Sequence, residues 1–161
     1  MQSKESIEQS YAHPDPWGFQ SHGDDHTRKS NILSILSGLG PFKRALDLGC
    51  GEGWITKDLP AEVIYGFEIS DNAASRFPKN VKRCFSPEGK YDLIVATGVL
   101  YHHYDNRYFL DVIKRHAENI VLTCNIKDWE VPEVEKLPMT QFVEMQFDYR
   151  EFTQRLRVFK V

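Results

Sequence analysis

Apolar residues in this chain follow two different periods, and the alternation of the two predicts a single α/β domain. Short, continuous apolar runs are typical of strands buried on both faces of a parallel sheet, and repeats every three or four positions are typical of helices. The expected strands are 42–49, 63–67, 81–84, 91–96 and 120–124, and the expected helices are 27–37, 54–59, 71–77 and 105–117. Residues 142–149 and 152–161 then alternate apolar and polar side chains, which predicts an antiparallel hairpin. We expect a doubly wound, Rossmann-like, mostly parallel sheet that ends in this hairpin.

Capping residues mark the expected starts of these helices. The candidate N-caps are Asp25 or Thr27 for the first helix, Ser70 or Asp71 for the third, and Asp105 for the last. Residues 1–10 are expected to form a marginal helix. Residues 85–90 carry no helical pattern. A bare loop should therefore join the third and fourth strands, although a parallel crossover normally takes a dozen or more residues.

Length and charge narrow the class of protein. A chain of 161 residues can bury one core, so we expect a single domain over residues 1–161. The net charge of −3 gives no basic surface, which makes nucleic acid an unfavourable partner. The 3 cysteines form no CxxC pair, no apolar run is long enough to span a membrane, and the first ten residues lack the apolar core of a signal peptide. These features predict a cytoplasmic protein with free thiols, and they leave its oligomeric state open.

The most informative stretch is ALDLGCGEGWITKDLPAEVIYGFEIS, residues 45–70. Gly49, Gly51 and Gly53 follow the first strand, and Glu68 ends the second. Glycines let a backbone turn sharply and approach a ligand closely, and an acid about 20 residues further on can bind ribose hydroxyls. The bulky Trp54 stands where a dinucleotide fingerprint needs a small residue, so a dinucleotide is disfavoured.

The run D-L-G-C-G-E-G at residues 47–53 resembles motif I of class I S-adenosylmethionine-dependent methyltransferases. The later FEIS and YDLIVATGVLYHH resemble the acidic strand end and the fourth-strand motif of that family. The resemblance implies a trimmed class I methyltransferase fold, S-adenosylmethionine as cofactor, and methyl transfer to the nitrogen or oxygen of a small molecule or sugar. The implied cofactor-binding residues are Asp47, Gly49, Cys50, Gly51, Gly53, Glu68, Ile69, Phe85, Ser86, Thr97 and Gly98.

Within that set, the resemblance also implies roles. Asp47 would lie near the amino group of the cofactor, and Glu68 would bind both ribose hydroxyls. The acid that often contacts adenine after the third strand is absent, so the backbone around Phe85 and Ser86 would recognise adenine, with Phe85 as a stacking candidate. Arg28 or Lys29 could meet the methionine carboxylate, and a solvated charge is the alternative for either residue.

The part of the site that binds the methyl acceptor is expected to be lined by aromatic residues. An amine or hydroxyl acceptor must lose a proton, and histidine is the usual agent. His102 aligns with a histidine common in related enzymes; the alternative is a structural, hydrogen-bonded histidine. Some relatives place metal-binding glutamates beside it, but this chain has Gly98 and Tyr101 there, so no metal is expected. Tyr11 is a second catalytic candidate, and the candidate acceptor wall comprises Trp17, Tyr101 and Tyr104.

Residues 1–26 are expected to form a lid-like segment ahead of a core at 27–161. Residues 11–26 hold prolines, glycines and aromatics in an order unsuited to a long helix. Their DPW sequence resembles the N-terminus of nodulation-type N-methyltransferases, which methylate a sugar-borne amine. We expect Trp17 to be largely buried, either as a plug at the edge of the core or also as a wall of the substrate site. His22 and His26 have a metal-compatible spacing, but Gly23 disfavours a helix, which favours a solvated loop.

Two other functions stay open from the sequence. The short third-strand region suits a non-catalytic domain that binds the cofactor as a sensor or subunit, whereas the intact glycine motif and the aromatic mouth suit an enzyme. Methylation of RNA or protein is the further alternative, and the acidic balance of the chain weakens the RNA case. Turnover of labelled cofactor with a pool of acceptors separates these possibilities.

Overall fold

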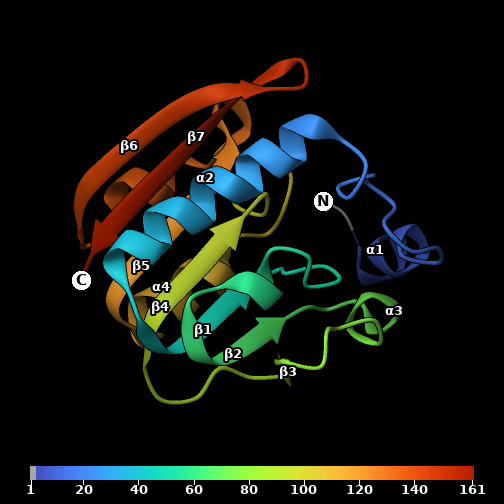
Figure 1. The fold of residues 1–161 in the computed structure, drawn as a ribbon, viewed down its shortest axis with the longest axis horizontal. Helices are drawn as coiled ribbons and strands as arrows, with labels where there is room; N and C mark the ends of the chain where they lie inside the picture. Colours follow the sequence, from blue (N-terminus) through green and yellow to red (C-terminus); the bar gives the residue numbers. More distant parts are fainter. Residues whose placement is uncertain (1–2) are drawn as a thin grey trace.

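The computed structural model describes residues 3–161, which form one seven-stranded sheet in the order β3-β2-β1-β4-β5-β7-β6 (Figure 1). The strands are β1 (Phe42–Leu48), β2 (Ala61–Phe67), β3 (Val81–Cys84), β4 (Tyr91–Thr97), β5 (Ala117–Ile126), β6 (Thr140–Tyr149) and β7 (Phe152–Lys160). The first five strands pair in parallel, and β7 runs antiparallel to both β5 and β6. The predicted doubly wound sheet with a closing hairpin is confirmed.

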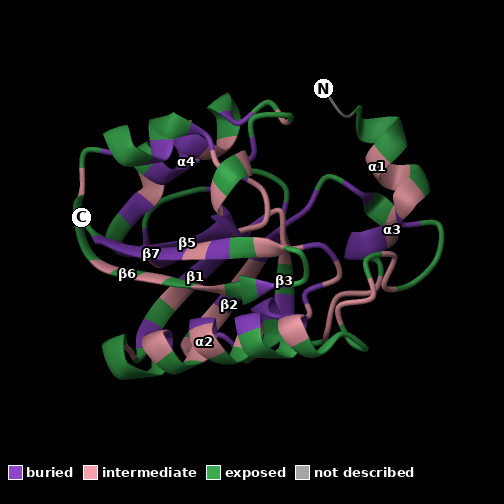
Figure 2. Cartoon of the chain, turned by 90° about the horizontal axis from the view of Figure 1, so that it is seen from above, coloured by how far each residue is buried: buried purple, intermediate pink, exposed green. Residues whose placement is uncertain are grey.

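Helices cover both faces of this sheet, as Figure 2 shows for α2 (Gly23–Leu39) and α4 (Arg107–His116). The short helices α1 (Lys4–Ser10) and α3 (Asp71–Ala74) lie side by side near the carboxyl ends of β1 and β2. Three 3₁₀ helices complete the chain: η1 (Thr56–Asp58), η2 (Lys127–Trp129) and η3 (Pro132–Lys136). The arrangement leaves the carboxyl ends of the parallel strands free of a long helix, which is where α/β sheets bind ligands.

The sheet separates two hydrophobic clusters. Leu46, Ile94 and Ile113 belong to the cluster on the α4 face, and Leu36 and Leu93 belong to the cluster on the α2 face. Strands β1 and β4 are buried on both sides, which explains their continuous apolar sequences. The core therefore fixes the ends of β1 and β4, and the loops of the site begin at these ends.

Several expected helix boundaries were wrong. His22, not Asp25 or Thr27, is the N-cap of α2, and the helix begins at Gly23, so the loop expected around the two histidines is the first turn of α2. Asn106 precedes α4 as its N-cap without a side-chain cap, while Asp105 Oδ1 accepts the Arg107 N–H at 3.2 Å. Of the two candidate N-caps of α3, Ser70 and Asp71, the structure has Ser70. The helix ends at Ala74 rather than near Phe77.

The connection between β3 and β4 has the expected form. No helix lies between Cys84 and Tyr91, and β3 pairs only with β2. Arg44 braces this loop, because its guanidinium donates to the carbonyls of Lys90 at 2.9 Å and Glu88 at 3.3 Å. None of the helices described between residues 3 and 161 is both long enough and apolar enough to cross a membrane.

Candidate functional site

The loop after β1 is shaped by glycines in a left-handed backbone conformation. Gly49 has a φ of 66° and Gly51 a φ of 56°, a region that side chains make costly. The N–H groups of Gly49 and Cys50 both donate to the Phe67 carbonyl, at 2.8 and 3.2 Å. The loop is therefore tied to the end of β2, with little side-chain bulk between its backbone and the cavity beside it.

Glu68 fixes the same loop from the end of β2. One carboxylate oxygen accepts the Gly51 N–H and the other accepts the Ser70 N–H, each at 2.9 Å. The side chain is buried, and burial raises the pKa of Glu68, while its backbone hydrogen bonds oppose the rise. Glu68 lines the cavity, so its remaining lone pairs are available to hydroxyl donors there.

Asp47, at the end of β1, is buried and only half satisfied. Oδ2 accepts the Thr56 hydroxyl at 2.7 Å, whereas Oδ1 has no hydrogen-bond partner among the described residues. Burial raises the pKa of Asp47 to about 7. A buried acceptor without a donor is costly, and this one lies in the lining of the cavity, where an ammonium group of a ligand would satisfy it.

Arg28 brings a cation to the same place. Its guanidinium lies 5.0 Å from the ring centre of Phe19 and 5.3 Å from that of Tyr149, and it pairs with the buried Asp25 at 3.2 Å. A Cβ atom added at Gly98 would lie 3.6 Å from Arg28 Nη1, which places this nitrogen beside the end of β4. Arg28 lines the cavity, so it fits a carboxylate ligand there.

Lys29, the other basic candidate, is already engaged. Its ammonium donates to the Trp54 carbonyl at 2.6 Å and pairs with Asp58 at 2.6 Å. Lys29 is absent from the cavity lining. Of the two candidates for a carboxylate, the structure therefore favours Arg28.

These groups lie at one end of a cavity of about 790 Å³ at the carboxyl edge of the sheet. The cavity brings together most of the cofactor-binding residues expected from the sequence: Asp47, Gly49, Cys50, Gly51, Glu68, Ile69, Thr97 and Gly98. Gly53 is not among these residues. It has a φ of 79°, and a Cβ atom added to it would lie 3.0 Å from Pro78 Cδ. The size suits an organic ligand, since such pockets typically measure roughly 300–1,000 Å³.

Phe85 and Ser86 do not reach this cavity, contrary to expectation. Phe85 is 76% exposed and packs against the Arg83 guanidinium at 4.5 Å. The bare loop after β3 turns away too early to bring either residue to the site. On this side the cavity is lined instead by Ile69, Val99, Tyr108 and Phe109. Tyr108 comes from the first turn of α4 and lies 5.3 Å from the Phe67 ring.

The other end of the cavity is aromatic. Tyr101, Tyr104 and Trp17 line it, as the sequence led us to expect, together with Trp129 and Phe152. Trp129 from η2 and Phe152 from β7 have ring centres 4.8 Å apart. The Tyr101 hydroxyl accepts the Ile126 N–H at 3.2 Å, and burial raises the pKa of Tyr101.

The adjacent residues His102 and His103 differ in their position relative to the cavity. Both histidines are exposed. His102 is absent from the cavity lining, and its ring Nδ1 donates to the Trp129 carbonyl at 3.0 Å. His103 lines the cavity beside Tyr104, with ring centres 4.4 Å apart. Partial burial, and next the neighbouring His102, lower the pKa of His103. The structure therefore places His103, and not the expected His102, in the wall of the cavity.

The segment 11–22, which we call the cover segment, lies over the glycine loop. Tyr11 is buried, and its hydroxyl lies 2.7 Å from the position of a Cβ atom added at Gly51. Trp17 Nε1 donates to that hydroxyl at 3.4 Å, but Trp17 itself is 42% exposed, so the expectation that it is largely buried was wrong. Trp17 faces both the cavity and solvent.

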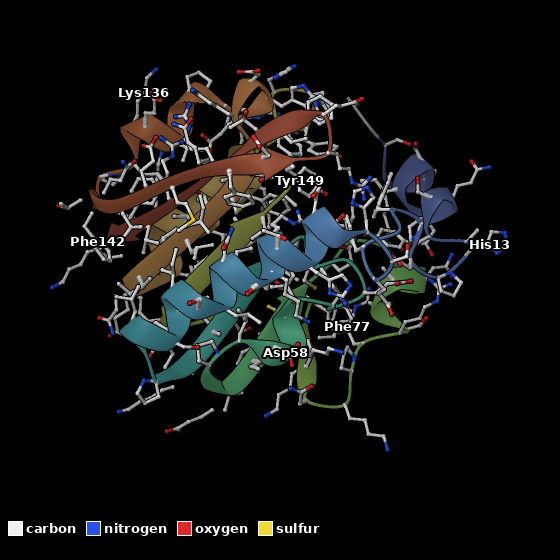
Figure 3. The ribbon with its side chains drawn as sticks, turned by 45° about the horizontal axis from the view of Figure 1, so that its top comes forward. His13, Asp58, Phe77, Lys136, Phe142 and Tyr149 are labelled. Carbon is white, nitrogen blue, oxygen red and sulfur yellow. The ribbon has the colours of Figure 1, made fainter. Side chains whose placement is uncertain are left out.

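The hairpin turn also reaches the cover segment. The Tyr149 hydroxyl, beside the amino end of α2 in Figure 3, donates to Asp25 at 2.7 Å. Arg150 Nη2 donates to Asp25 at 2.7 Å and to the Trp17 carbonyl at 2.9 Å. Sequence reasoning missed four residues of the site, because each comes from η2 or from the hairpin, far along the chain: Trp129, Tyr149, Arg150 and Phe152.

Metal ligation has no geometric support in this region. Between residues 3 and 161, no group of three or more histidine, cysteine, aspartate or glutamate side chains is arranged to hold an ion. His22 instead accepts the Asp24 N–H at 3.4 Å, and His26 Nε2 lies 2.8 Å from the Gln20 carbonyl. The two histidines thus stabilise the start of α2.

The strand order, the glycine loop and the acid at the end of β2 together define a class I methyltransferase fold with a nucleotide-type site. The family model described as a methyltransferase domain matches residues 22–146, more than half of the chain. The chain belongs to this family of methyltransferase domains, and its identification as a class I S-adenosylmethionine-dependent methyltransferase is confirmed.

One curated protein is similar to part of this chain. Nodulation protein S of Sinorhizobium fredii (strain NBRC 101917 / NGR234) is 28% identical over 102 residues. The match covers 55% of this chain and 47% of that protein, so the chain spans about half the length of the curated relative it matches.

Solved structures extend the likeness over the whole fold. The N-methyltransferase NodS from Bradyrhizobium japonicum, in complex with S-adenosyl-L-homocysteine, superposes with a TM-score of 0.84 at 19% identity and covers 99% of this chain and 98% of that one. The magnesium protoporphyrin IX methyltransferase from Synechocystis, with bound S-adenosylmethionine, gives a TM-score of 0.76 at 15% identity, covering 98% and 97%. At these identities the likeness establishes the fold.

Proposed function

We propose that this protein is an S-adenosylmethionine-dependent methyltransferase that acts on the nitrogen or oxygen of a small molecule or sugar. One observation carries the proposal: a single cavity joins the glycine loop, with its unsatisfied Asp47 and its free Arg28 nitrogen, to an aromatic chamber. Family membership, and the cofactor forms bound to both structural relatives, support the same activity.

The residues present fit the cofactor. Asp47 Oδ1 is a buried acceptor that an amino group would satisfy, Arg28 is a cation that a carboxylate would satisfy, and Glu68 offers acceptors for ribose hydroxyls. Ile69 and Tyr108 line the side of the cavity that would take the adenine ring. When bound, S-adenosylmethionine supplies a methyl group on a positively charged sulfur, so the protein's task is chiefly to align the acceptor.

At the aromatic end, His103 is the residue placed to take a proton from the acceptor. Its lowered pKa keeps the ring neutral near pH 7, which is the form that accepts a proton. Trp129, Phe152 and Tyr104 surround the acceptor space with apolar surface. Such walls exclude water and suit the flat or apolar face of a small acceptor better than a phosphate backbone.

The charges of the lining favour a small molecule over RNA. Arg28 and Arg150 are the arginines that line the cavity within residues 3–161, and both pair with Asp25. Binding of a nucleic acid requires many cations along the path of the phosphates, whereas this lining offers two arginines and the chain carries a net charge of −3. The similar structure from Bradyrhizobium japonicum is that of an N-methyltransferase, which supports nitrogen as the acceptor atom. A cytoplasmic setting is part of the proposal, because Cys50, Cys84 and Cys124 are free thiols.

A screen separates catalysis from cofactor binding alone. The purified protein is incubated with methyl-labelled S-adenosylmethionine and pools of amines, phenols and amino sugars, and labelled product is counted against a blank without protein. Binding of S-adenosylhomocysteine is measured in parallel by calorimetry. Binding together with labelled product supports the proposal. Binding without turnover on any pool supports the alternative of a sensor or subunit, and absence of binding refutes both.

A further inference from the structure

Arg76 contacts the cover segment from outside the cavity. It follows α3, and both its terminal nitrogens donate to the Tyr11 carbonyl at 3.0 Å. Its Nη1 also pairs with Glu52 Oε1 at 2.7 Å. Arg76 is absent from the cavity lining, so any effect on a ligand passes through the residues it holds.

Glu52 completes the link from the side of the glycine loop. This residue stands between Gly51 and Gly53, and its second oxygen, Oε2, accepts the Asp15 N–H at 2.9 Å. One carboxylate therefore joins Arg76 to the backbone of the cover segment at a second point. Asp15 has a φ of 47° and caps the turn that follows, because its carboxylate accepts the N–H groups of Phe19 and Gln20 at 2.8 and 3.1 Å.

The position of the Tyr11 side chain depends on these bonds. Tyr11 is held at its carbonyl by Arg76, and its hydroxyl lies over Gly51, at 2.7 Å from a Cβ atom added there. Helix α1 is anchored separately, since Asn72 donates to the Glu8 carboxylate at 3.0 Å. Between these anchors, the backbone from Tyr11 to Asp15 is held to the rest of the domain by the Arg76–Glu52 pair.

We propose that Arg76 is a positioning residue that, with Glu52, holds the cover segment closed over the cofactor end of the cavity. The inference rests on the proposed function for its ligand, but the closure itself is a property of the ligand-free chain. The pair is partly exposed, with side chains 28% and 13% accessible. Loss of the pair frees Tyr11 and opens the cavity to solvent.

Hydrogen exchange of the full chain tests the closure without a ligand. In Arg76→Ala, amides of residues 11–22 should exchange about tenfold faster, because charge-assisted hydrogen bonds to Tyr11 and Glu52 are lost. Amides of β1 and β4 should not change. Arg115→Ala is the matched control, since Arg115 makes one exposed ion pair with Asp111 on α4. Arg76→Lys keeps the charge without the forked donors, and it should restore part of the protection.

Ligand release gives the second measurement. S-adenosylhomocysteine should dissociate about tenfold faster from Arg76→Ala than from the wild type, with a melting temperature of the ligand-free protein close to that of Arg115→Ala. If Arg76→Ala fails to fold, Glu52→Gln replaces it, since the amide preserves shape and removes the charge.

The outcomes separate the two proposals. Unchanged exchange at residues 11–22 in a folded Arg76→Ala or Glu52→Gln variant overturns the positioning role, whatever the ligand does. Failure of the wild type to bind S-adenosylhomocysteine overturns the proposed function and leaves the exchange test valid. Faster exchange with an unchanged dissociation rate shows that the cover does not retain the ligand, which also overturns the inference.

Discussion

The two ends of the cavity are built in different ways. At the cofactor end, the backbone sets the geometry: Gly49 and Gly51 adopt left-handed conformations, and Glu68 accepts two backbone N–H groups. At the acceptor end, side chains from separate parts of the chain meet, among them Trp17, Trp129 and Phe152. The cofactor end is therefore formed largely by a motif of consecutive residues, whereas the acceptor end depends on how distant segments of the chain pack together.

This difference has a chemical consequence. A loop defined by its backbone presents the same hydrogen-bonding groups whatever the neighbouring side chains are, which suits a cofactor shared by a family. An aromatic chamber changes shape with each substitution, which suits an acceptor that differs between relatives. The cofactor end should therefore be sensitive to single atoms, and the acceptor end to which residue faces inward.

The largest expected effect is at the acceptor end. His103→Ala should lower the rate of methyl transfer about 10²–10⁴-fold, the usual contribution of a general base. Because its pKa is lowered by burial and by His102, the neutral, active form of His103 persists to lower pH than in an ordinary histidine. The rate should rise with pH and level off once His103 is neutral. A pH profile of turnover, on an acceptor found by the screen, measures both.

His102→Ala is the matched control for this prediction. Its ring lies outside the cavity and bonds to the Trp129 carbonyl, so its removal should cost less than about tenfold in rate. Tyr101 and Tyr104 are the other titratable groups that pack against His103, and burial raises the pKa of both. A larger loss in His102→Ala than in His103→Ala would reverse the assignment.

The next largest effect is at the cofactor end. Glu68→Ala should weaken binding of S-adenosylhomocysteine by about 1.5–3 kcal/mol, roughly 10–100-fold, because hydrogen bonds to a charged group are lost and the Gly51 N–H loses its acceptor. Calorimetry measures the affinity. Phe85→Ala is the control: it lies outside the cavity and should change the affinity by less than about 0.5 kcal/mol. Equal affinities for wild type and a folded Glu68→Ala variant would exclude Glu68 from the site.

The same contrast explains what the sequence could predict. The doubly wound sheet, its closing hairpin and the position of Glu68 at the end of the second strand follow from local patterns of apolar and glycine residues, and the structure contains them. Phe85 was misplaced because the direction of a loop without regular structure depends on tertiary contacts. His102 and His103 are adjacent on a turn, and no periodicity states which ring faces the cavity. The role of Arg76 could not be predicted from a local motif, because its partner Tyr11 is distant in the sequence and comes close only in the folded chain.

A smaller effect concerns the contact between the glycine loop and the cover segment. A Cβ atom at Gly51 would lie 2.7 Å from the Tyr11 hydroxyl, and the backbone φ of 56° adds strain. Gly51→Ala should therefore weaken binding of S-adenosylhomocysteine about tenfold. In the double variant with Tyr11→Phe the colliding hydroxyl is absent, so part of the affinity should return, with a coupling of about 1 kcal/mol.

The double-mutant cycle distinguishes two reasons for the glycine. Recovery in the double variant shows that Tyr11 of the cover segment needs the space above Gly51. No recovery, with Tyr11→Phe alone binding normally, shows that the ligand itself needs that space and that Tyr11 moves when it binds. Calorimetry of the four proteins gives the coupling, and melting temperatures show whether each is folded.

The smallest expected effect is a proton released at Asp47. Burial raises the pKa of Asp47 to about 7, so near pH 7 about half of the ligand-free molecules carry a proton there. An ammonium group at Oδ1 favours the ionised form, so binding of S-adenosylhomocysteine should lower this pKa and release up to about half a proton at pH 7. The affinity should accordingly rise slightly with pH through 7 and level off above it.

Calorimetry at pH 7 in phosphate and in Tris, whose ionisation enthalpies differ, measures the released proton as a difference in apparent binding enthalpy. Asp47→Asn should remove that difference, whereas Asp105→Asn, an exposed acid at the rim of the same cavity, should preserve it. Equal enthalpies in both buffers for the wild type would show that Asp47 does not meet the amino group of the ligand.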